Sequence, residues 1–183
     1  MATITNQAAL SYNGVTTLSN IAVGELVEVL TATKTAADTT YTAGGVKTFV
    51  ISLVNSSAAA LTGLTVTDTL GSYTFSGNTL YPLTYVTGSL LYYVNGALQA
   101  TPTVTATAPL TVTGVTVPAG GSAMLIYTAR VNEYAPLGVE DSITNTATIT
   151  GGGLTSSVTA TETINASPAP QLAISKSISP TMG

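Results

Sequence analysis

The sequence predicts an all-β protein with the architecture of an antiparallel β-sandwich, and three observations support this. Apolar residues at helical spacing are almost absent, whereas apolar and polar residues alternate with a period of two in several runs. Thr, which favours strands, is the commonest residue of the chain. Turn sequences separate the runs at short intervals, and many short strands at such spacing are typical of sandwiches.

Two runs show the alternation most clearly and assign side chains to faces. In the run 64–70, three threonines alternate with predicted inward residues, which are Leu64, Val66, Asp68 and Leu70. In the run 143–150, four threonines alternate with predicted inward residues, which are Ile143, Asn145, Ala147 and Ile149. Threonine-out, aliphatic-in strands suit a sheet that has one face in water.

Four turn sequences separate the predicted strands: Asn13-Gly14, Asn95-Gly96, Pro118–Gly121 and Gly151–Gly153. The first two predict β-hairpins, one near the N-terminus and one between the runs 90–94 and 97–100. The third separates the run 110–117 from the run 123–131, and the fourth separates 143–150 from 154–163. The longest stretch without a clear pattern is 71–85, which we interpret as an irregular insertion.

The composition excludes several classes of function. Charged residues make up 7% of the chain and only four residues are basic, so no basic patch can form and nucleic-acid binding is not expected. Cys and His are absent, which removes disulfides, the commonest metal ligands and the usual near-neutral proton shuttle. Ser and Thr are plentiful, but no activating base accompanies them. The sequence therefore predicts no enzyme, no cofactor and no metal site.

The sequence also bears on membrane insertion and export. It contains no run of about 18 or more apolar residues, so no membrane insertion is expected. The segment Met1–Thr5 has neither the basic start nor the long apolar run of a signal peptide. We therefore expect either that a signal has been removed or that the protein leaves the cell by another route, such as release from a lysed mother cell onto a spore.

Two internal similarities divide the chain into one complete module and two partial ones. Leu30–Thr35 matches Leu172–Ser177, and Ile4–Asn6 opens a hairpin as Ile143–Asn145 does. The predicted domains are a hairpin resembling the end of a module (1–29), a complete module (30–166), and a Pro-containing linker with a strand resembling the start of a next module (167–183). The alternative is chance similarity among Thr-rich strands, because biased composition raises false matches.

Several stretches follow one another in a recognisable order along the complete module. They are Thr33–Ala36, Tyr41–Gly44, Phe49–Asn55, Leu61–Leu70, Leu83–Ser89, Val117–Gly121 and Asn145–Thr148. In this order they resemble the bacterial surface-protein repeat called domain of unknown function 11, over about Leu30 to Thr163 and again from Leu172. The resemblance implies an immunoglobulin-like sandwich in cell-wall, sheath or spore-surface proteins, without enzymatic activity. Family members usually stand in long tandem arrays behind a signal peptide, and this chain departs from that pattern.

The same family overlaps with pilin domains that form a spontaneous isopeptide bond between a Lys and an Asn beside a carboxylic acid. Burial lowers the pKa of a lysine and raises that of a carboxylic acid, so the amine becomes nucleophilic and the acid can donate a proton. Strand parity places Lys34, Asp68 and Asn145 on the apolar side of an early, a middle and a late strand. The alternative roles are structural: Asp68 caps a turn, Asn145 binds backbone, and Lys34 extends to solvent.

The chain is expected to assemble with itself. A terminal strand that starts a module exposes unpaired backbone groups, and the N-terminal hairpin presents a second edge. The expected assembly strand, with Leu172, Ile174, Lys176 and Ile178, would add to a sheet of the next subunit and give a head-to-tail homopolymer. The predicted function is a structural subunit of a bacterial surface or spore-surface fibre or layer, such as a spore appendage. The alternative is a cell-surface adhesin whose loops bind a host or matrix glycan or protein.

Overall fold

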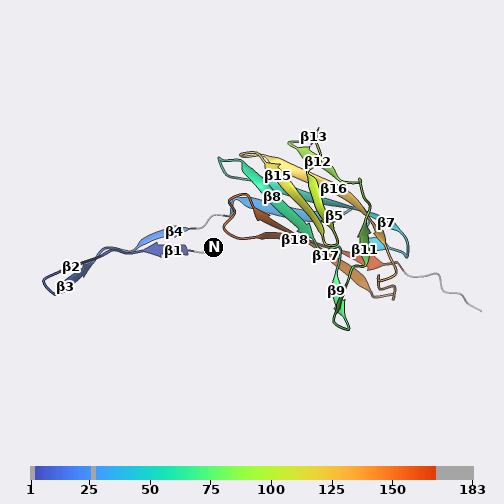
Figure 1. Ribbon diagram of the computed structural model, residues 1–183, viewed down its shortest axis with the longest axis horizontal. Helices are drawn as coiled ribbons and strands as arrows, with labels where there is room; N and C mark the ends of the chain where they lie inside the picture. The colour runs from blue at the N-terminus through green and yellow to red at the C-terminus, as the bar shows by residue number, and fades with distance from the viewer. Residues whose placement is uncertain (1–2, 26–27, 168–183) are drawn as a thin grey trace, which may run out of the picture.

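The chain forms an immunoglobulin-like β-sandwich of two sheets, with a separate N-terminal hairpin (Figure 1). The computed structural model describes residues 3–25 and 28–167, and in these ranges the regular structure is entirely β. Accordingly, no helix within those two ranges is long and apolar enough to cross a membrane. The all-β prediction is confirmed.

The first sheet is built around two long antiparallel strands, β7 (Val46–Asn55) and β16 (Ser122–Val131). Its hydrogen-bonded order is β13-β12-β16-β7-β5, and β11 also pairs with β16. The shorter strands of this sheet are β5 (Leu30–Ala36), β11 (Leu83–Tyr85), β12 (Leu91–Val94) and β13 (Ala97–Gln99). Every pair in this sheet is antiparallel, as expected.

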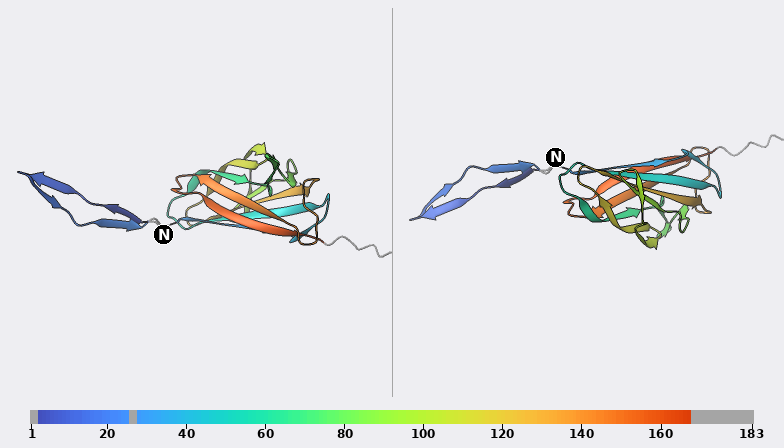
Figure 2. Two further views of the ribbon diagram at one scale, coloured as in Figure 1. Left: turned by 90° about the horizontal axis from the view of Figure 1, so that it is seen from below. Right: turned by 90° about the horizontal axis from the view of Figure 1, so that it is seen from above.

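The second sheet has the order β14-β15-β8-β17-β18-β6. Its strands are β6 (Thr40–Tyr41), β8 (Leu61–Asp68), β14 (Thr103–Thr107), β15 (Leu110–Val117), β17 (Ser142–Gly151) and β18 (Val158–Ala166). One pair departs from the antiparallel expectation, because the two-residue strand β6 runs parallel to the end of β18. Figure 2 shows the sandwich from two further sides.

The inner faces of both sheets carry the side chains that the period of two predicts. All eight inward residues predicted for the runs 64–70 and 143–150 are buried. They face a layer from β7 and β16 that comprises Phe49, Ile51, Leu53, Leu125, Tyr127 and Ala129. At one lateral edge of the sandwich, β5 of the first sheet packs against β18 of the second. This edge places β5 beside β18, and β18 is the hydrogen-bonded neighbour of β17.

The N-terminal hairpin lies outside both sheets of the sandwich (Figure 1). Its strands are β1 (Thr3–Asn6), β2 (Ala9–Tyr12), β3 (Val15–Leu18) and β4 (Ala22–Glu25), with β1 paired to β4 and β2 to β3. The turn between β2 and β3 is Asn13-Gly14, both at positive φ, as the sequence predicts for a two-residue hairpin. The second predicted hairpin, at Asn95-Gly96, joins β12 to β13 in the same way.

Two expectations about strand boundaries are wrong. The stretch 71–85 is not irregular: it contains a hairpin of β9 (Tyr73–Phe75) and β10 (Asn78–Leu80), followed by β11 on the first sheet. The last strand begins at Val158 rather than at residue 154, because the chain turns through three consecutive glycines at positive φ and continues as a loop. The predicted C-terminal strand lies outside the described residues.

Candidate functional site

The three residues predicted for an isopeptide centre meet inside the sandwich. Lys34 projects inward from β5, Asp68 from the end of β8, and Asn145 from β17. The side chains of Lys34 and Asp68 are 0% and 1% exposed, and Asn145 is 0% exposed. The cluster joins the two sheets, since β5 belongs to one and β8 and β17 to the other. Lys34 therefore does not extend to solvent, and that structural alternative is wrong.

An ion pair and a tyrosine connect the cluster. The Lys34 ammonium donates to Asp68 Oδ2 in a short contact. The Tyr127 hydroxyl donates to the same oxygen at 2.7 Å, and it accepts from Asn145 Nδ2 at 3.0 Å. Tyr127 lies on β16, so a third strand of the core takes part. Every buried polar side-chain atom in the described part of the chain has a hydrogen-bond partner.

Burial shifts the pKa of the Lys34 amine and that of the Tyr127 phenol. The pKa of Lys34 is lowered chiefly by desolvation, while the negative charge of Asp68 and its hydrogen bond act in the opposite direction. The pKa of Tyr127 is raised well above its usual value, first by burial and then by the charge of Asp68. The cluster thus holds an amine with a reduced preference for the charged form and a phenol that stays protonated.

Aromatic rings line the path of the Lys34 side chain. Its Nζ lies 5.2 Å from the ring centroid of Phe49 and 6.0 Å from that of Tyr127. The two rings stack on each other with centroids 5.5 Å apart. Such rings exclude water while offering a weak attraction to a cation. The amine consequently sits in a largely apolar site that is closed to solvent.

The turn after β8 holds the far side of Asn145. The backbone N–H of Leu70 donates to Asp68 Oδ1 at 3.0 Å, so Asp68 also caps this turn. Leu70 itself has φ of 52°, an uncommon conformation for a residue with a side chain. The backbone N–H of Gly71 and the hydroxyl of Thr69 then reach Asn145 Oδ1 at 3.2 and 3.3 Å. The turn-capping and backbone-binding roles expected as alternatives are therefore both present beside the ion pair.

Two members of this neighbourhood are not among the residues that the sequence predicts. Tyr127 is the first, although its position in phase with the inward residues Leu125 and Ala129 of β16 could have indicated it. Glu162 is the second: it lies opposite Asn145 in the β17–β18 pair, is half-buried, and its charge acts on Lys34. Since β17 lies between β8 and β18, Lys34 is influenced by a carboxylate on each side of the strand that carries Asn145.

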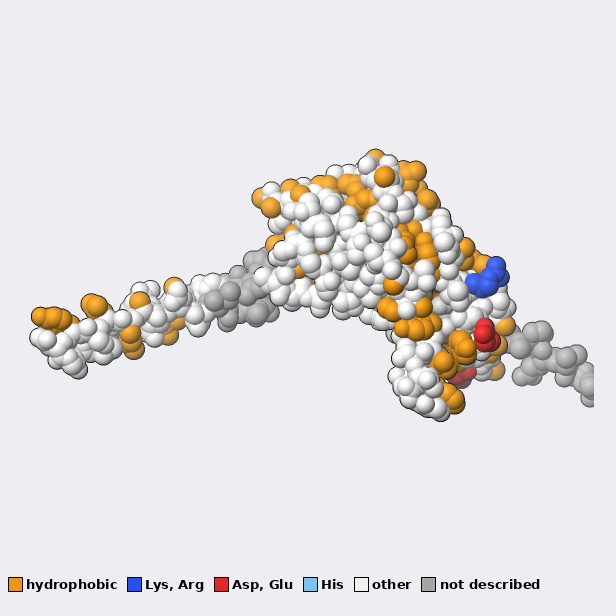
Figure 3. Space-filling view, viewed as in Figure 1, with side chains coloured by type: hydrophobic (Ala, Val, Ile, Leu, Met, Phe, Trp, Pro, Cys, Tyr) orange, Lys and Arg blue, Asp and Glu red, His pale blue; other side chains and the backbone are white. Residues whose placement is uncertain are grey.

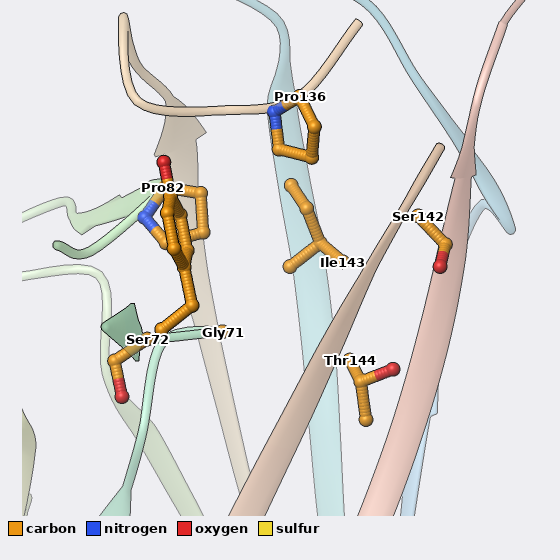
Figure 4. A pocket seen from close by; sticks show the side chains of 8 residues that line it. Gly71, Ser72, Pro82, Pro136, Ser142, Ile143 and Thr144 are labelled. Carbon is orange, nitrogen blue, oxygen red and sulfur yellow. The ribbon is translucent and has the colours of Figure 1, made fainter. Parts of the chain in front are cut away.

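The other predicted sites differ in outcome. The assembly residues Leu172, Ile174, Lys176 and Ile178 lie outside the described residues. Within residues 3–25 and 28–167, no group of acidic side chains could hold a metal ion. A shallow apolar pocket of about 400 Å³ opens between the β9 end of the sandwich and the start of β17, lined in part by Pro82, Pro136 and Ile143 (Figure 4). No charged residue lines this pocket.

Comparisons with known proteins bear on the fold. No protein-family model matches the chain, and no curated protein matches it in sequence. The assignment to domain of unknown function 11 therefore stays a resemblance. Solved structures do match, and the fold is that of pilin and adhesin sandwich domains.

Three of these structures illustrate the likeness. The major pilin subunit BcpA of Bacillus cereus has a TM-score of 0.51 at 15% identity, over 89% of this chain and 48% of that one. The N-terminal domain of a Streptococcus gordonii adhesin has a TM-score of 0.52 at 14% identity, and the match covers 83% of this chain and 35% of that one. The pilus backbone RrgB of Streptococcus pneumoniae has a TM-score of 0.51 at 14% identity, and the match covers 66% of this chain and 31% of that one. The chain thus spans about half or less of the length of each.

Proposed function

We propose that this chain is a structural subunit of a bacterial surface or spore-surface fibre, and that an isopeptide bond between Lys34 and Asn145 reinforces its sandwich. The observation that carries the proposal is the fully buried Lys34 side chain paired with Asp68 beside a buried Asn145. Burying an ion pair is costly relative to apolar packing, so its presence in a core calls for a role. The likeness of fold to pilin domains supports the structural reading.

The bond would form by attack of the neutral Lys34 amine on Cγ of Asn145, with loss of ammonia. One C–N bond forms and one breaks, so the reaction needs neither an oxidant nor a cofactor. The link would join β5 of the first sheet to β17 of the second. It would hold the sheets together as a disulfide does in other surface proteins, in a chain that has no Cys.

Intact-mass measurement of the denatured full-length protein tests this bond. We expect a mass one ammonia below the sequence mass. Lys34→Met and Asn145→Ala should each restore the mass calculated from their own sequences. Asn55→Ala is a matched control, because Asn55 is also 0% exposed but binds backbone away from the cluster. That variant should still lose ammonia.

The N-terminal hairpin supports self-assembly as the way in which the subunits make a fibre. Its larger apolar side chains are mostly exposed; they are Leu10, Tyr12, Val15, Leu18, Ile21 and Val23, with exposed fractions of 55–76%. Glu25 is the only charged residue in the range 3–25 that holds its four strands. A two-stranded hairpin is marginally stable by itself in water, so contact with another subunit would stabilise it. Figure 3 shows apolar side chains spread along this hairpin.

Addition of the segment 172–179 to a sheet of the next subunit would give a head-to-tail contact that propagates into a filament. The available edges are β13 and β14, each of which has one hydrogen-bonded neighbour in the described sheets. Electron microscopy of the full chain and of a chain lacking 171–183 tests this mode of assembly. Filaments should form only from the full chain, and filaments from the shortened chain would exclude the assembly strand.

An adhesin is the second candidate, favoured by one surface feature. Aromatic residues at the β9 end of the sandwich are partly exposed beside the apolar pocket, with Tyr73 at 39%, Phe75 at 64% and Tyr134 at 45% (Figure 3). Exposed aromatic clusters at loop ends suit glycan or protein ligands. A glycan and matrix-protein array probed with the monomer separates the two candidates, since a structural subunit should give a blank array together with filaments.

A further inference from the structure

The hydrogen bonds around Asn145 determine which end of its carboxamide faces which partner. The backbone N–H of Gly71 can only donate, so the atom that it contacts at 3.2 Å is the carbonyl oxygen Oδ1. The Thr69 hydroxyl accepts from Thr146 N–H at 3.1 Å, which leaves its own proton for Oδ1 at 3.3 Å. The amide nitrogen Nδ2 consequently faces the Tyr127 hydroxyl.

Tyr127 joins that nitrogen to the ion pair. Its hydroxyl is 3.0 Å from Asn145 Nδ2 and 2.7 Å from Asp68 Oδ2, and the same Oδ2 contacts the Lys34 ammonium. All four side chains are buried. An uninterrupted line of hydrogen bonds therefore runs from the lysine amine, through the acid and the phenol, to the nitrogen that would leave as ammonia.

From this line we propose that Tyr127 is a catalytic residue of isopeptide formation, which passes a proton from Asp68 to the leaving nitrogen of Asn145. The proposal rests on the function proposed above. It assigns the acid and the phenol different tasks: Asp68 takes the proton from the amine, and Tyr127 delivers it. The Gly71 N–H and the Thr69 hydroxyl serve the opposite end of the carboxamide, where negative charge develops on Oδ1.

The protons and bonds balance along this route. Lys34 passes a proton to Asp68, and the neutral amine attacks Cγ of Asn145, which moves an electron pair onto Oδ1. Asp68 donates its proton to the Tyr127 oxygen while Tyr127 gives its own proton to Nδ2. The Cγ–Nδ2 bond breaks, the carbonyl re-forms, and ammonia leaves. The new amide nitrogen then gives its extra proton to Asp68, so the products are the amide, ammonia and a protonated Asp68.

The surroundings of Tyr127 suit this task. Its ring packs against those of Phe49 and Tyr85, with centroids 5.5 and 6.2 Å away. The raised pKa, which burial and the Asp68 charge cause, keeps the hydroxyl protonated and able to donate near neutral pH. A relay requires that the group both donates and accepts, and the Tyr127 hydroxyl does both in the structure.

The rate of ammonia loss during refolding tests the proposal. Wild-type chain, Tyr127→Phe and Tyr92→Phe are purified in denaturant before they fold, diluted to refold, and sampled by intact mass, with protease resistance reporting the fold. Tyr127→Phe should fold but lose ammonia about 100-fold more slowly or worse, as expected when a proton-transfer group is removed. Tyr92→Phe is the matched control, because Tyr92 is also a buried tyrosine whose hydroxyl bonds backbone, at 2.5 and 3.1 Å to Thr116, away from the cluster. Its rate should equal that of wild type.

The outcomes separate the relay from the bond itself. If the wild type loses ammonia and folded Tyr127→Phe loses it equally fast, the relay is overturned while the bond stands. If the wild type keeps its sequence mass, the proposed bond itself fails. Should Tyr127→Phe not fold, the wild-type rate is compared in light and heavy water: proton transfer through the tyrosine predicts a slower rate in heavy water, and equal rates would overturn the relay.

Discussion

Lys34 and Asp68 form an ion pair that spans the two sheets of the sandwich and is closed to solvent on all sides. The Tyr127 hydroxyl and the turn after β8 both hold the Asp68 carboxylate of this pair. Asn145 shares the same tyrosine and the same turn. The proposed amide would join the amine of this pair to the carboxamide of Asn145.

Removing one partner of the ion pair should lower the stability of the fold strongly, whereas replacing both partners by apolar residues should lower it little. In the Asn145→Ala background, which cannot form the isopeptide, Lys34→Met leaves the buried Asp68 without its cationic partner. We expect a loss of about 3–5 kcal/mol in the free energy of unfolding. Adding Asp68→Leu should recover most of that loss, because an apolar pair avoids the desolvation penalty. Urea titration of the three chains measures both steps; a double replacement as unstable as the single one would contradict this account.

Gly71 should not tolerate a side chain. Its φ is +72°, and an added Cβ would overlap Cγ2 of Ile143. Gly71→Ala should therefore lose about 2–4 kcal/mol of stability from overpacking and strain together. Gly77→Ala is the matched control, since Gly77 has φ of +80° but nothing within 4 Å of an added Cβ. The control should lose only the conformational part, about 1 kcal/mol, and equal losses for both variants would argue against the clash.

The raised pKa of Tyr127 predicts a loss of stability in alkali. In the unfolded chain the phenol ionises near its ordinary pKa of 10.0, whereas in the folded chain it holds its proton to higher pH. The stability that Tyr127 contributes is thus fully present below about pH 10 and is lost as the pH rises toward the folded pKa, at about 1.4 kcal/mol per pH unit.

Comparison of Asn145→Ala with Asn145→Ala/Tyr127→Phe isolates this contribution, because neither chain can form the isopeptide. Chemical denaturation from about pH 8 to about pH 11 should show the difference in unfolding free energy shrinking above about pH 10. A difference that stays constant over this range would show that Tyr127 ionises alike in both states.

The N-terminal hairpin should matter for assembly and not for the fold of the sandwich. Its strands pair only with one another, and its apolar side chains are exposed. Replacing Tyr12 and Val15 by Ser should leave the unfolding free energy within about 0.5 kcal/mol of the wild type. The same change should shorten or abolish filaments in electron microscopy. Normal filaments would remove the hairpin from the assembly contact.

The sequence predicts correctly that the cluster residues lie on the inner faces of the sheets. Side chains of a strand alternate between its two faces, so the local pattern alone determines the face. Asp68 and Asn145 alternate with threonines in uninterrupted runs, and both are buried. Tyr127 could not be assigned a role in this way, since the partners of its hydroxyl come from β8 and β17 through non-local packing. Its pairing is a property of the assembled sandwich.

The missed hairpin of β9 and β10 has a different physical cause. Its turn is Ser76-Gly77, with φ of 48° and 80°. Serine rarely adopts positive φ, so the dipeptide carries a weaker turn signal than Asn13-Gly14 or Asn95-Gly96, which have the same geometry. The start of the last strand is predicted too early for a related reason. Leu154 continues the apolar pattern of the sequence, but after the three glycines at positive φ the chain rejoins the sheet only at Val158.

The proposed bond between Lys34 and Asn145 is tested most directly by a mass spectrum of a complete protease digest. We expect a branched peptide in which the segment containing Lys34 is joined to the segment containing Asn145, with a mass one ammonia below the sum of the two. Neither segment should occur free in the wild type. Recovery of both segments as separate peptides at their sequence masses, from correctly folded protein, would contradict the proposed bond.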